Sequence, residues 1–176
     1  MSLHCQLLLA MLWTMATEPD EARLAAWRAF VNAHAAVVDR IEHELIDQGE
    51  IPLSWYDVLL ALWEAPNQGL RLHELARTVV LSRSGLTRLV DRLEAAGLLR
   101  REPCPDDRRG AVAVLTPAGR AAQLAAWPAY ARGIEAHFAQ HLSDDEARIL
   151  ADVLGRVDAA VREPSTPAID CAKQPG

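Results

Sequence analysis

The stretch "SRSGLTRLVDRLEAAG", residues 82–97, has the pattern of a short amphipathic helix, and this helix decides the fold. Ser82 is a favoured residue just before a helix, and Gly97 is a favoured residue just after one. The apolar side chains recur every three or four positions and predict one inward face, made of Leu86, Leu89, Val90 and Leu93. The other face carries Ser84, Thr87, Arg88 and Asp91, and Arg83 lies beside it.

The segments around this helix predict a winged helix-turn-helix. Before it come a helix in "PLSWYDVLLALWEAP", residues 52–66, with Ser54 as its N-cap and Pro66 at its end, and a short helix in "RLHELARTVV", residues 71–80. After it, "LLRRE" and "AVAVLT" are short β-compatible runs that predict an antiparallel hairpin with a long loop, Pro103 to Gly110. We therefore expect a mainly α fold with a small β-hairpin wing.

Charge is distributed unevenly along the 176 residues. The whole chain has 18 Lys and Arg against 24 Asp and Glu, a net charge of −6. Between Arg71 and Arg120 there are ten arginines and six acids, so this segment carries 10 − 6 = +4. A basic segment between acidic arms indicates that this part of the protein meets a polyanion.

Double-stranded DNA fits this pattern, because the major groove accepts one α-helix whose first residues reach the base edges. The residues expected at the groove are those at the start of the second helix: Ser82, Arg83, Ser84, Gly85, Thr87 and Arg88. The hairpin tip, "PCPDDRRGAV", carries Arg108 and Arg109, which suit the narrow and negative minor groove. A neighbouring carboxylate, Asp106 or Asp107, can brace one guanidinium while the other points outward.

Long helices flank this lobe. Residues 19–49 contain an apolar and histidine seam with alternating spacings of three and four, made of Leu24, Trp27, Val31, His34, Val38, Ile41 and Leu45. A helix with Thr116 as N-cap and Pro117 in its first turn is expected to reach about His141, with a kink at Pro128. A last helix starts with a Ser143–Glu146 capping box. Seams of this length favour a partner helix from a second chain.

The expected organisation has five parts. Residues 1–18 form an N-terminal extension, either an extra helix or a start codon assigned too early, and residues 19–50 form a dimerisation helix. Residues 51–120 form the DNA-binding lobe, residues 121–162 the C-terminal dimerisation helices, and residues 163–176 a flexible tail. Three scattered cysteines and the absence of a basic signal-type start favour a cytoplasmic protein.

The stretch "LARTVVLSRSGLTRLVDRLEAAGLLRREPCPDDRRGAVAVLTPAGR", residues 75–120, resembles the signature of the multiple antibiotic resistance regulator (MarR) family. The similarity extends from about Pro19 to Val161. This resemblance implies an obligate homodimer of winged-helix subunits that binds palindromic operators and acts as a repressor. It also implies that Asp107 pairs with one of Arg108 and Arg109, while the other arginine enters the minor groove.

Relatives in this family bind phenolic or aromatic acids near the dimer helices, so the resemblance implies an effector pocket. Its candidate residues are Trp27, His34, Trp55, Tyr56 and Asp57. Two other functions stay open: a redox switch through Cys104, which is expected in the exposed wing loop, and an architectural winged-helix module that binds protein or nonspecific DNA. The sequence has no nucleophile motif or phosphate loop and no metal-ligand cluster, so neither an enzyme nor a cofactor or metal site is expected.

Overall fold

The computed structural model describes residues 18–79, 83–104 and 107–161, and it leaves the side chains of residues 83, 84 and 107–110 undescribed. The expected N-cap Ser82, the N-terminal extension before residue 18 and the C-terminal tail therefore lie outside the described residues. Contacts divide the chain between Val38 and Asp39 into two compact units.

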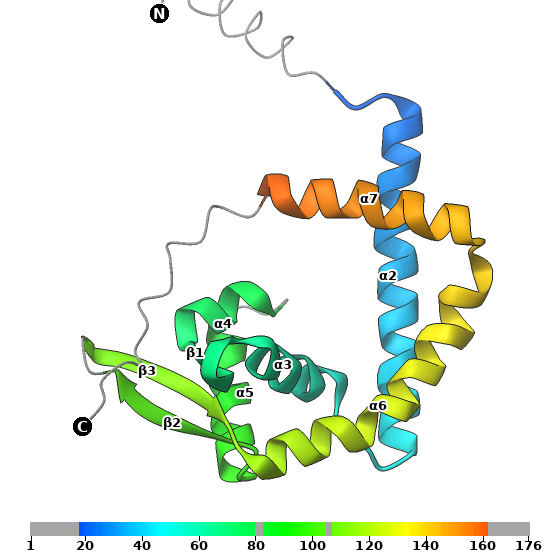
Figure 1. The fold of residues 1–176 in the computed structure, drawn as a ribbon. Coiled ribbons are helices and arrows are strands. Elements are labelled where there is room, and N and C mark those ends of the chain that lie inside the picture. The colour runs from blue at the N-terminus through cyan, green and yellow to red at the C-terminus, as the bar shows by residue number, and fades with distance from the viewer. Residues whose placement is uncertain (1–17, 80–82, 105–106, 162–176) are drawn as a thin grey trace, which may run out of the picture. The chain divides into compact units, whose positions relative to one another are not determined.

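The fold is mainly helical with a small antiparallel sheet, as expected (Figure 1). The elements follow in this order: α2 (Glu21–Asp47), α3 (Leu53–Glu64), η1 (Pro66–Gln68), β1 (Gly69–Arg71), α4 (Leu72–Thr78), α5 (Arg83–Ala95), β2 (Leu99–Cys104), β3 (Asp107–Leu115), α6 (Pro117–His137), η2 (Ala139–His141) and α7 (Asp144–Val161). This is the order of a winged helix-turn-helix lobe, α3 to β3, between long helices.

The sheet has three strands in the order β1-β3-β2, one more than the sequence predicts. In β1, Leu70 lies opposite Ala113 of β3. The hairpin strands also run further than expected, since β2 continues to Cys104 and β3 starts at Asp107, with a register shift after Pro103. The long loop predicted for residues 103–110 is therefore wrong, because all of these residues except 105 and 106 lie within β2 or β3.

The core of the lobe lies between α3, α4, α5 and the sheet. Its members are the expected inward residues of α5, which are almost fully buried, together with residues of the other elements: Val58, Leu59, Ala61, Leu62, Leu75, Val79, Leu99, Ala113 and Leu115. The end of α5 is fixed by Gly97, whose φ of +72° suits glycine. There the N–H of Leu98 donates to the carbonyl of Leu93, and that of Gly97 to the carbonyl of Glu94, at 2.9 Å each.

Three predicted N-caps lie within the described residues, and two of them follow the local sequence. Thr116 caps α6 by accepting a hydrogen bond from the N–H of Gly119, and Ser143 and Glu146 form the expected capping box. The predicted cap at Ser54 is wrong, because α3 already begins at Leu53. The N–H of Leu53 instead donates to Glu42 Oε2 of α2 at 2.6 Å, so a carboxylate from another helix satisfies this end.

The helix predicted to reach His141 ends as an α-helix at His137, because Phe138 leaves the helical conformation, and η2 follows. The helix α6 includes Pro128 within its length. None of the helices in the part of the chain that the structure describes is long and apolar enough to cross a membrane.

The long flanking helices leave apolar side chains uncovered. In α2, Ile41 and Leu45 are buried, but the apolar residues of its first part are exposed: Trp27, Phe30, Val31 and Val38. The helix α7 is described over its whole length and contains no buried residue. Its exposed large apolar side chains are Ile149, Val153, Val157 and Val161.

Candidate nucleic-acid interface

The helix α5 has one buried and one exposed face. Leu86, Leu89 and Val90 are at most 3% exposed, while Thr87 and Arg88 are exposed on the other side. Gly85 is half-buried near the start of the helix. The structure therefore places the polar face where the sequence predicts it, and the helix can offer this face to a ligand without loss of core packing.

The remaining candidates at the start of α5 are only partly described. Arg83 and Ser84 are its first two residues, so their backbones lie in the first turn, and Ser82 lies just outside the described residues. The N-terminal turn of a helix presents N–H groups without intrahelical partners, which favours an anionic ligand such as a phosphate.

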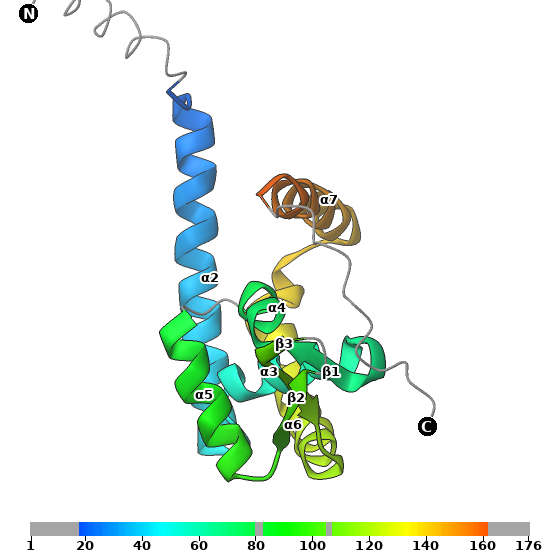
Figure 2. The ribbon, with the colours of Figure 1, turned by 90° about the vertical axis from the view of Figure 1, so that its left-hand side faces the viewer.

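The wing candidates Asp107, Arg108 and Arg109 are the first three residues of β3. The hairpin formed by β2 and β3 lies next to α5, as the contacts between α5 and β2 and the two views in Figures 1 and 2 agree. The pairing of Asp107 with an arginine concerns undescribed side chains and stays a prediction. The fold nevertheless places a basic strand start and a polar helix face in one lobe.

A different brace, which sequence reasoning missed, joins the wing to α5. Arg101 of β2 forms ion pairs with Asp91 and Glu94 of α5, and its backbone N–H donates to Glu94 Oε1 at 2.9 Å. These contacts raise the pKa of the Arg101 guanidinium against the opposing effect of its burial. The sequence pattern that could have predicted this contact is the acidic pair Asp91 and Glu94 near the end of α5, followed by Arg101 in the next strand.

Two further arginines of the basic segment are engaged within the chain. Arg100 pairs with Glu102, with 2.7 Å between Nη2 and Oε1. Arg120 lies over the ring of Trp63, with its Cζ 3.3 Å from the ring centroid, and donates to the side chain of Gln123. Together with Arg101, at least three of the ten arginines between residues 71 and 120 therefore have intramolecular partners. Fewer arginines of this segment are then candidates for contact with a polyanion.

The effector candidates lie in both units. In the first unit, Trp27 is 62% exposed and Phe30 lies between it and His34, with ring centroids 6.1 and 6.2 Å away. In the second unit, Trp55 packs against the core and Tyr56 is buried.

The Tyr56 hydroxyl belongs to a polar contact between α3 and α6. It accepts a hydrogen bond from Gln123 Nε2 at 2.9 Å, and its ring meets Tyr130 edge-on at 4.8 Å. Gln123 is the one buried polar residue within the described chain. Next to Tyr56, Asp57 is exposed, but partial desolvation by its surroundings and the nearby Glu42 charge raise the pKa of its carboxyl to about 6. The structure thus gives Tyr56 a core role and leaves Asp57 as a weakly acidic group.

Cys104 does not occupy the exposed loop that the sequence predicts. It is the last residue of β2, and its side chain is only 3% exposed. The expectation of an exposed wing thiol is wrong because the strand continues through this position. A buried thiol is poorly accessible to peroxide, which weakens the redox alternative.

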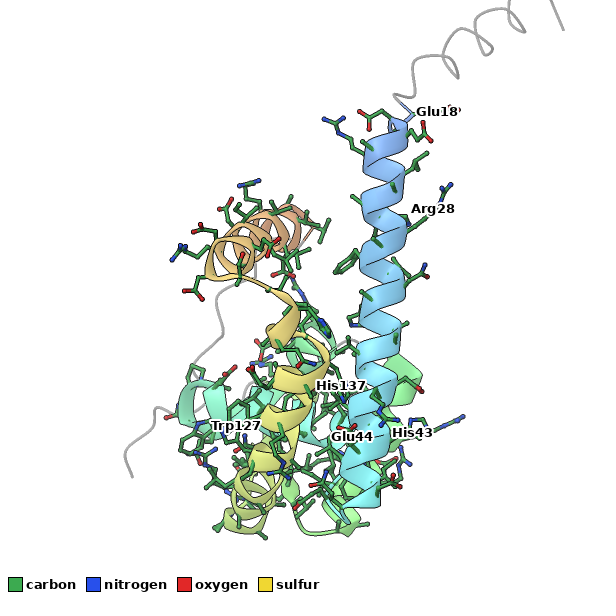
Figure 3. All side chains as sticks on the ribbon, turned by 90° about the vertical axis from the view of Figure 1, so that its right-hand side faces the viewer. Glu18, Arg28, His43, Glu44, Trp127 and His137 are labelled. Carbon is green, nitrogen blue, oxygen red and sulfur yellow. The ribbon has the colours of Figure 1, made fainter. Side chains whose placement is uncertain are left out.

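One titratable contact joins the C-terminal part of α2 to α6. Glu44 Oε1 lies 2.9 Å from Nε2 of His137, and Figure 3 shows these two side chains together while His43 points elsewhere. The hydrogen bond with His137 lowers the pKa of the Glu44 carboxyl, and Arg40 adds to this. Within the described residues no group of three or more histidine, cysteine or acidic side chains could hold a metal ion.

Comparison with known proteins matches this lobe to one family. The MarR family model matches residues 50–110. The HTH-type transcriptional regulator TtmR of Methylorubrum extorquens is 37% identical over 90 residues, which cover 51% of this chain and 45% of that protein. The match thus spans less than half the length of that regulator.

Solved structures extend the similarity to the flanking helices. The MarR family regulator Sco3205 of Streptomyces coelicolor, solved in complex with DNA, superposes with a TM-score of 0.73 at 27% identity, over 84% of this chain and 96% of that chain. The MarR family regulator AbsC from the same organism gives 0.71 at 27% identity, over 84% and 99%. The similarity therefore includes the long helices on both sides of the lobe.

Proposed function

Because the chain belongs to the MarR family of winged helix-turn-helix regulators, we propose that it is a sequence-specific DNA-binding repressor that acts as a homodimer. In this function α5 enters the major groove and the hairpin tip reaches the minor groove. A regulator of this family is a DNA-binding protein and not an enzyme.

The observation that carries the proposal is the exposed polar face of α5 beside a basic hairpin. Thr87 and Arg88 are exposed, while the opposite face of α5 is fully used by the core. Arg83, Arg108 and Arg109 stand at the start of α5 and of β3. The related Sco3205 was solved with DNA, which supports the same ligand class for this lobe.

The uncovered apolar faces support a dimer. The N-terminal part of α2 exposes Trp27, Phe30 and Val31, and α7 exposes Ile149 and Val157, among them residues of the two predicted seams. Large apolar faces on long helices are costly in water and typical of subunit interfaces. A two-fold symmetric dimer would present two α5 helices to a palindromic operator.

Release by a small aromatic or phenolic effector belongs to the same proposal. Tyr130 and Trp127 of α6 add aromatic rings to the Tyr56 region, and Asp57 lies beside Tyr56 on α3. The second candidate is an architectural winged-helix module that binds DNA without sequence preference. The buried Cys104 gives the thiol switch the least support.

The test is selection of binding sites from random duplex DNA by the full-length protein, followed by fluorescence anisotropy titrations. The proposal expects an inverted repeat with half-site centres about 34–36 Å apart, or a multiple of that distance. It also expects binding at least about a thousandfold tighter than to scrambled DNA. Equal binding to every sequence would favour the architectural module, and no DNA binding would refute both.

A further inference from the structure

The end of α5 and the start of α6 meet at one carbonyl group, that of Leu98. The Thr116 hydroxyl lies 2.7 Å from the carbonyl oxygen of Gly97 and 2.9 Å from that of Leu98, and these two acceptors share its single proton. The Thr116 backbone N–H donates to the same Leu98 oxygen at 3.2 Å. The hydroxyl also accepts from the N–H of Gly119 at 3.0 Å, so one side chain caps α6 and binds the turn after α5.

Gly119 lets these two segments approach each other. A Cβ atom at this position would lie 1.9 Å from the Leu98 carbonyl oxygen and 2.9 Å from its carbonyl carbon. Both atoms are backbone, so neither can move aside without shifting the turn itself. The first turn of α6 is therefore in direct contact with the turn that ends α5, and only glycine fits there.

The same turn is part of the end of α5. The N–H of Leu98 bonds to the Leu93 carbonyl in the last turn of α5, and Gly97 supplies the left-handed residue that this ending requires. The last turn of α5, residues 97 and 98, and the first turn of α6 thus form one continuous hydrogen-bonded junction. The helix α5 cannot pivot on α6 unless these bonds break.

We propose that Thr116 and Gly119 are positioning residues that set the direction of α5 by fixing its end on α6. The inference rests on the proposed function and deepens it, because it states that this junction determines the distance between the two α5 helices of a dimer. Two recognition helices can match two half-sites only at a fixed separation. A loosened junction therefore alters the preference for half-site spacing as well as the affinity.

The experiment compares four full-length variants on a set of palindromic sites whose central spacing differs by one or two base pairs. Thr116→Val removes the hydroxyl with little change in shape, and Thr116→Ser restores it. Gly119→Ala pushes on the Leu98 carbonyl. The control Gly155→Ala places a methyl group on the side of α7 opposite Val153 and Val157, where no atom lies within 4 Å. Circular dichroism melts establish that each variant is folded.

We expect Thr116→Val to lose about tenfold in affinity for the preferred spacing, the value of roughly one net hydrogen bond. Gly119→Ala should lose at least as much, because its methyl group displaces the Leu98 carbonyl. Their affinities for the different spacings should become nearly equal, while Thr116→Ser and Gly155→Ala keep the wild-type preference. Folded Thr116→Val protein with unchanged affinity and spacing preference overturns the proposal. If Gly119→Ala fails to fold, the comparison of Thr116→Val with Thr116→Ser decides whether the proposal holds.

A second measurement separates this inference from the proposed function. If the wild-type protein binds none of the palindromic sites, the proposed function fails. The role of the junction is then tested by amide hydrogen exchange of the free protein, without DNA. Thr116→Val should then speed exchange of the Leu98 and Thr116 amides, with α3 unchanged. Unchanged exchange at those two amides refutes the positioning role independently.

Discussion

The carboxylate of Glu94 accepts two hydrogen bonds from Arg101, one from the backbone N–H at 2.9 Å and one from the guanidinium group. Glu94 lies near the end of α5 and Arg101 lies in β2, so a single carboxylate fixes the direction of the strand against the helix. Asp91 holds the other terminal nitrogen of the same guanidinium. This arginine connects α5 to the hairpin of β2 and β3, and its side chain is three-quarters covered.

The first prediction follows from this contact. Arg101→Ala should lower the free energy of unfolding by about 1 kcal/mol, because the ion pairs are only partly buried. Operator affinity should fall as well, but the slope of log K against log salt should stay unchanged, since Arg101 does not hold a phosphate. The matched control is Arg100→Ala, which removes the preceding arginine of β2, whose ion pair is with Glu102 and not with α5. A slope shallower by about two for the Arg101→Ala dimer would place this residue on the DNA.

The second prediction concerns the wing. Of Arg108→Ala and Arg109→Ala, the variant that removes the minor-groove contact should lose affinity and make the salt slope shallower by about two per dimer. The variant that removes the bracing arginine should lose affinity with the slope unchanged, and Asp107→Ala should resemble it. Anisotropy titrations at four salt concentrations measure this. If all three variants bind like the wild type, the wing does not contact DNA.

The third prediction tests the dimer. Val157 is 55% exposed on α7, on the apolar face, whereas Ala159 is exposed on the other side of the same helix. Val157→Asp would bury an unpaired charge in the proposed interface, so the variant should be monomeric and lose operator binding. Ala159→Asp adds the same charge and should remain dimeric. Light scattering at micromolar concentration measures both, and a monomeric wild-type protein would refute the interface.

Local signals in the sequence predicted the helices and several of their ends. The caps at Thr116 and Ser143 and the terminating Gly97 depend on residues within four positions, and the structure confirms them. The cap at Ser54 was wrong because the group that satisfies the start of α3 is Glu42, eleven residues earlier and on another helix. Such a contact is not encoded in the neighbouring residues.

In the sheet and the candidate site, too, the features set by nearby residues were predicted and those set by distant contacts were not. The periodicity of α5 correctly separated its buried face from its exposed face, because packing imposes the helical repeat. The three-residue strand β1 pairs with residues more than forty positions later and has no pattern of its own. The burial of Cys104 and the pairing of Arg101 also depend on how β2 lies against its neighbours, so composition and spacing alone did not reveal them.

The fourth prediction concerns pH. Partial desolvation and the Glu42 charge raise the pKa of the exposed Asp57 carboxyl from 3.8 to about 6, so between these values the folded state binds more protons than the unfolded state. Stability therefore decreases as pH rises through this window, and the penalty is complete above about pH 6. Asp57→Asn should raise the melting temperature near neutral pH, with the two proteins converging near about pH 4. Melting curves with a constant difference from acid to neutral pH would contradict the raised pKa.

The last prediction concerns base recognition by α5. Arg88 is exposed beside Thr87 on the face opposite Leu89 and Val90. If Arg88 reads a guanine in the major groove, Arg88→Ala should cost about 1–3 kcal/mol per half-site on the selected operator and relax the preference at one base position. Arg92→Ala, an exposed arginine one helical turn later, is the matched control and should leave base preference intact.

The measurement is a set of titrations of wild type and both variants on the selected palindrome and on single-base changes of it. A uniform loss on cognate and scrambled DNA would assign Arg88 to a phosphate, because a phosphate contact is independent of sequence. Full affinity together with full base discrimination in Arg88→Ala would mean that another face of α5 meets the DNA. The buried positions Leu86, Leu89 and Val90 leave little freedom for such a rotation, so we expect loss of discrimination at one position per half-site.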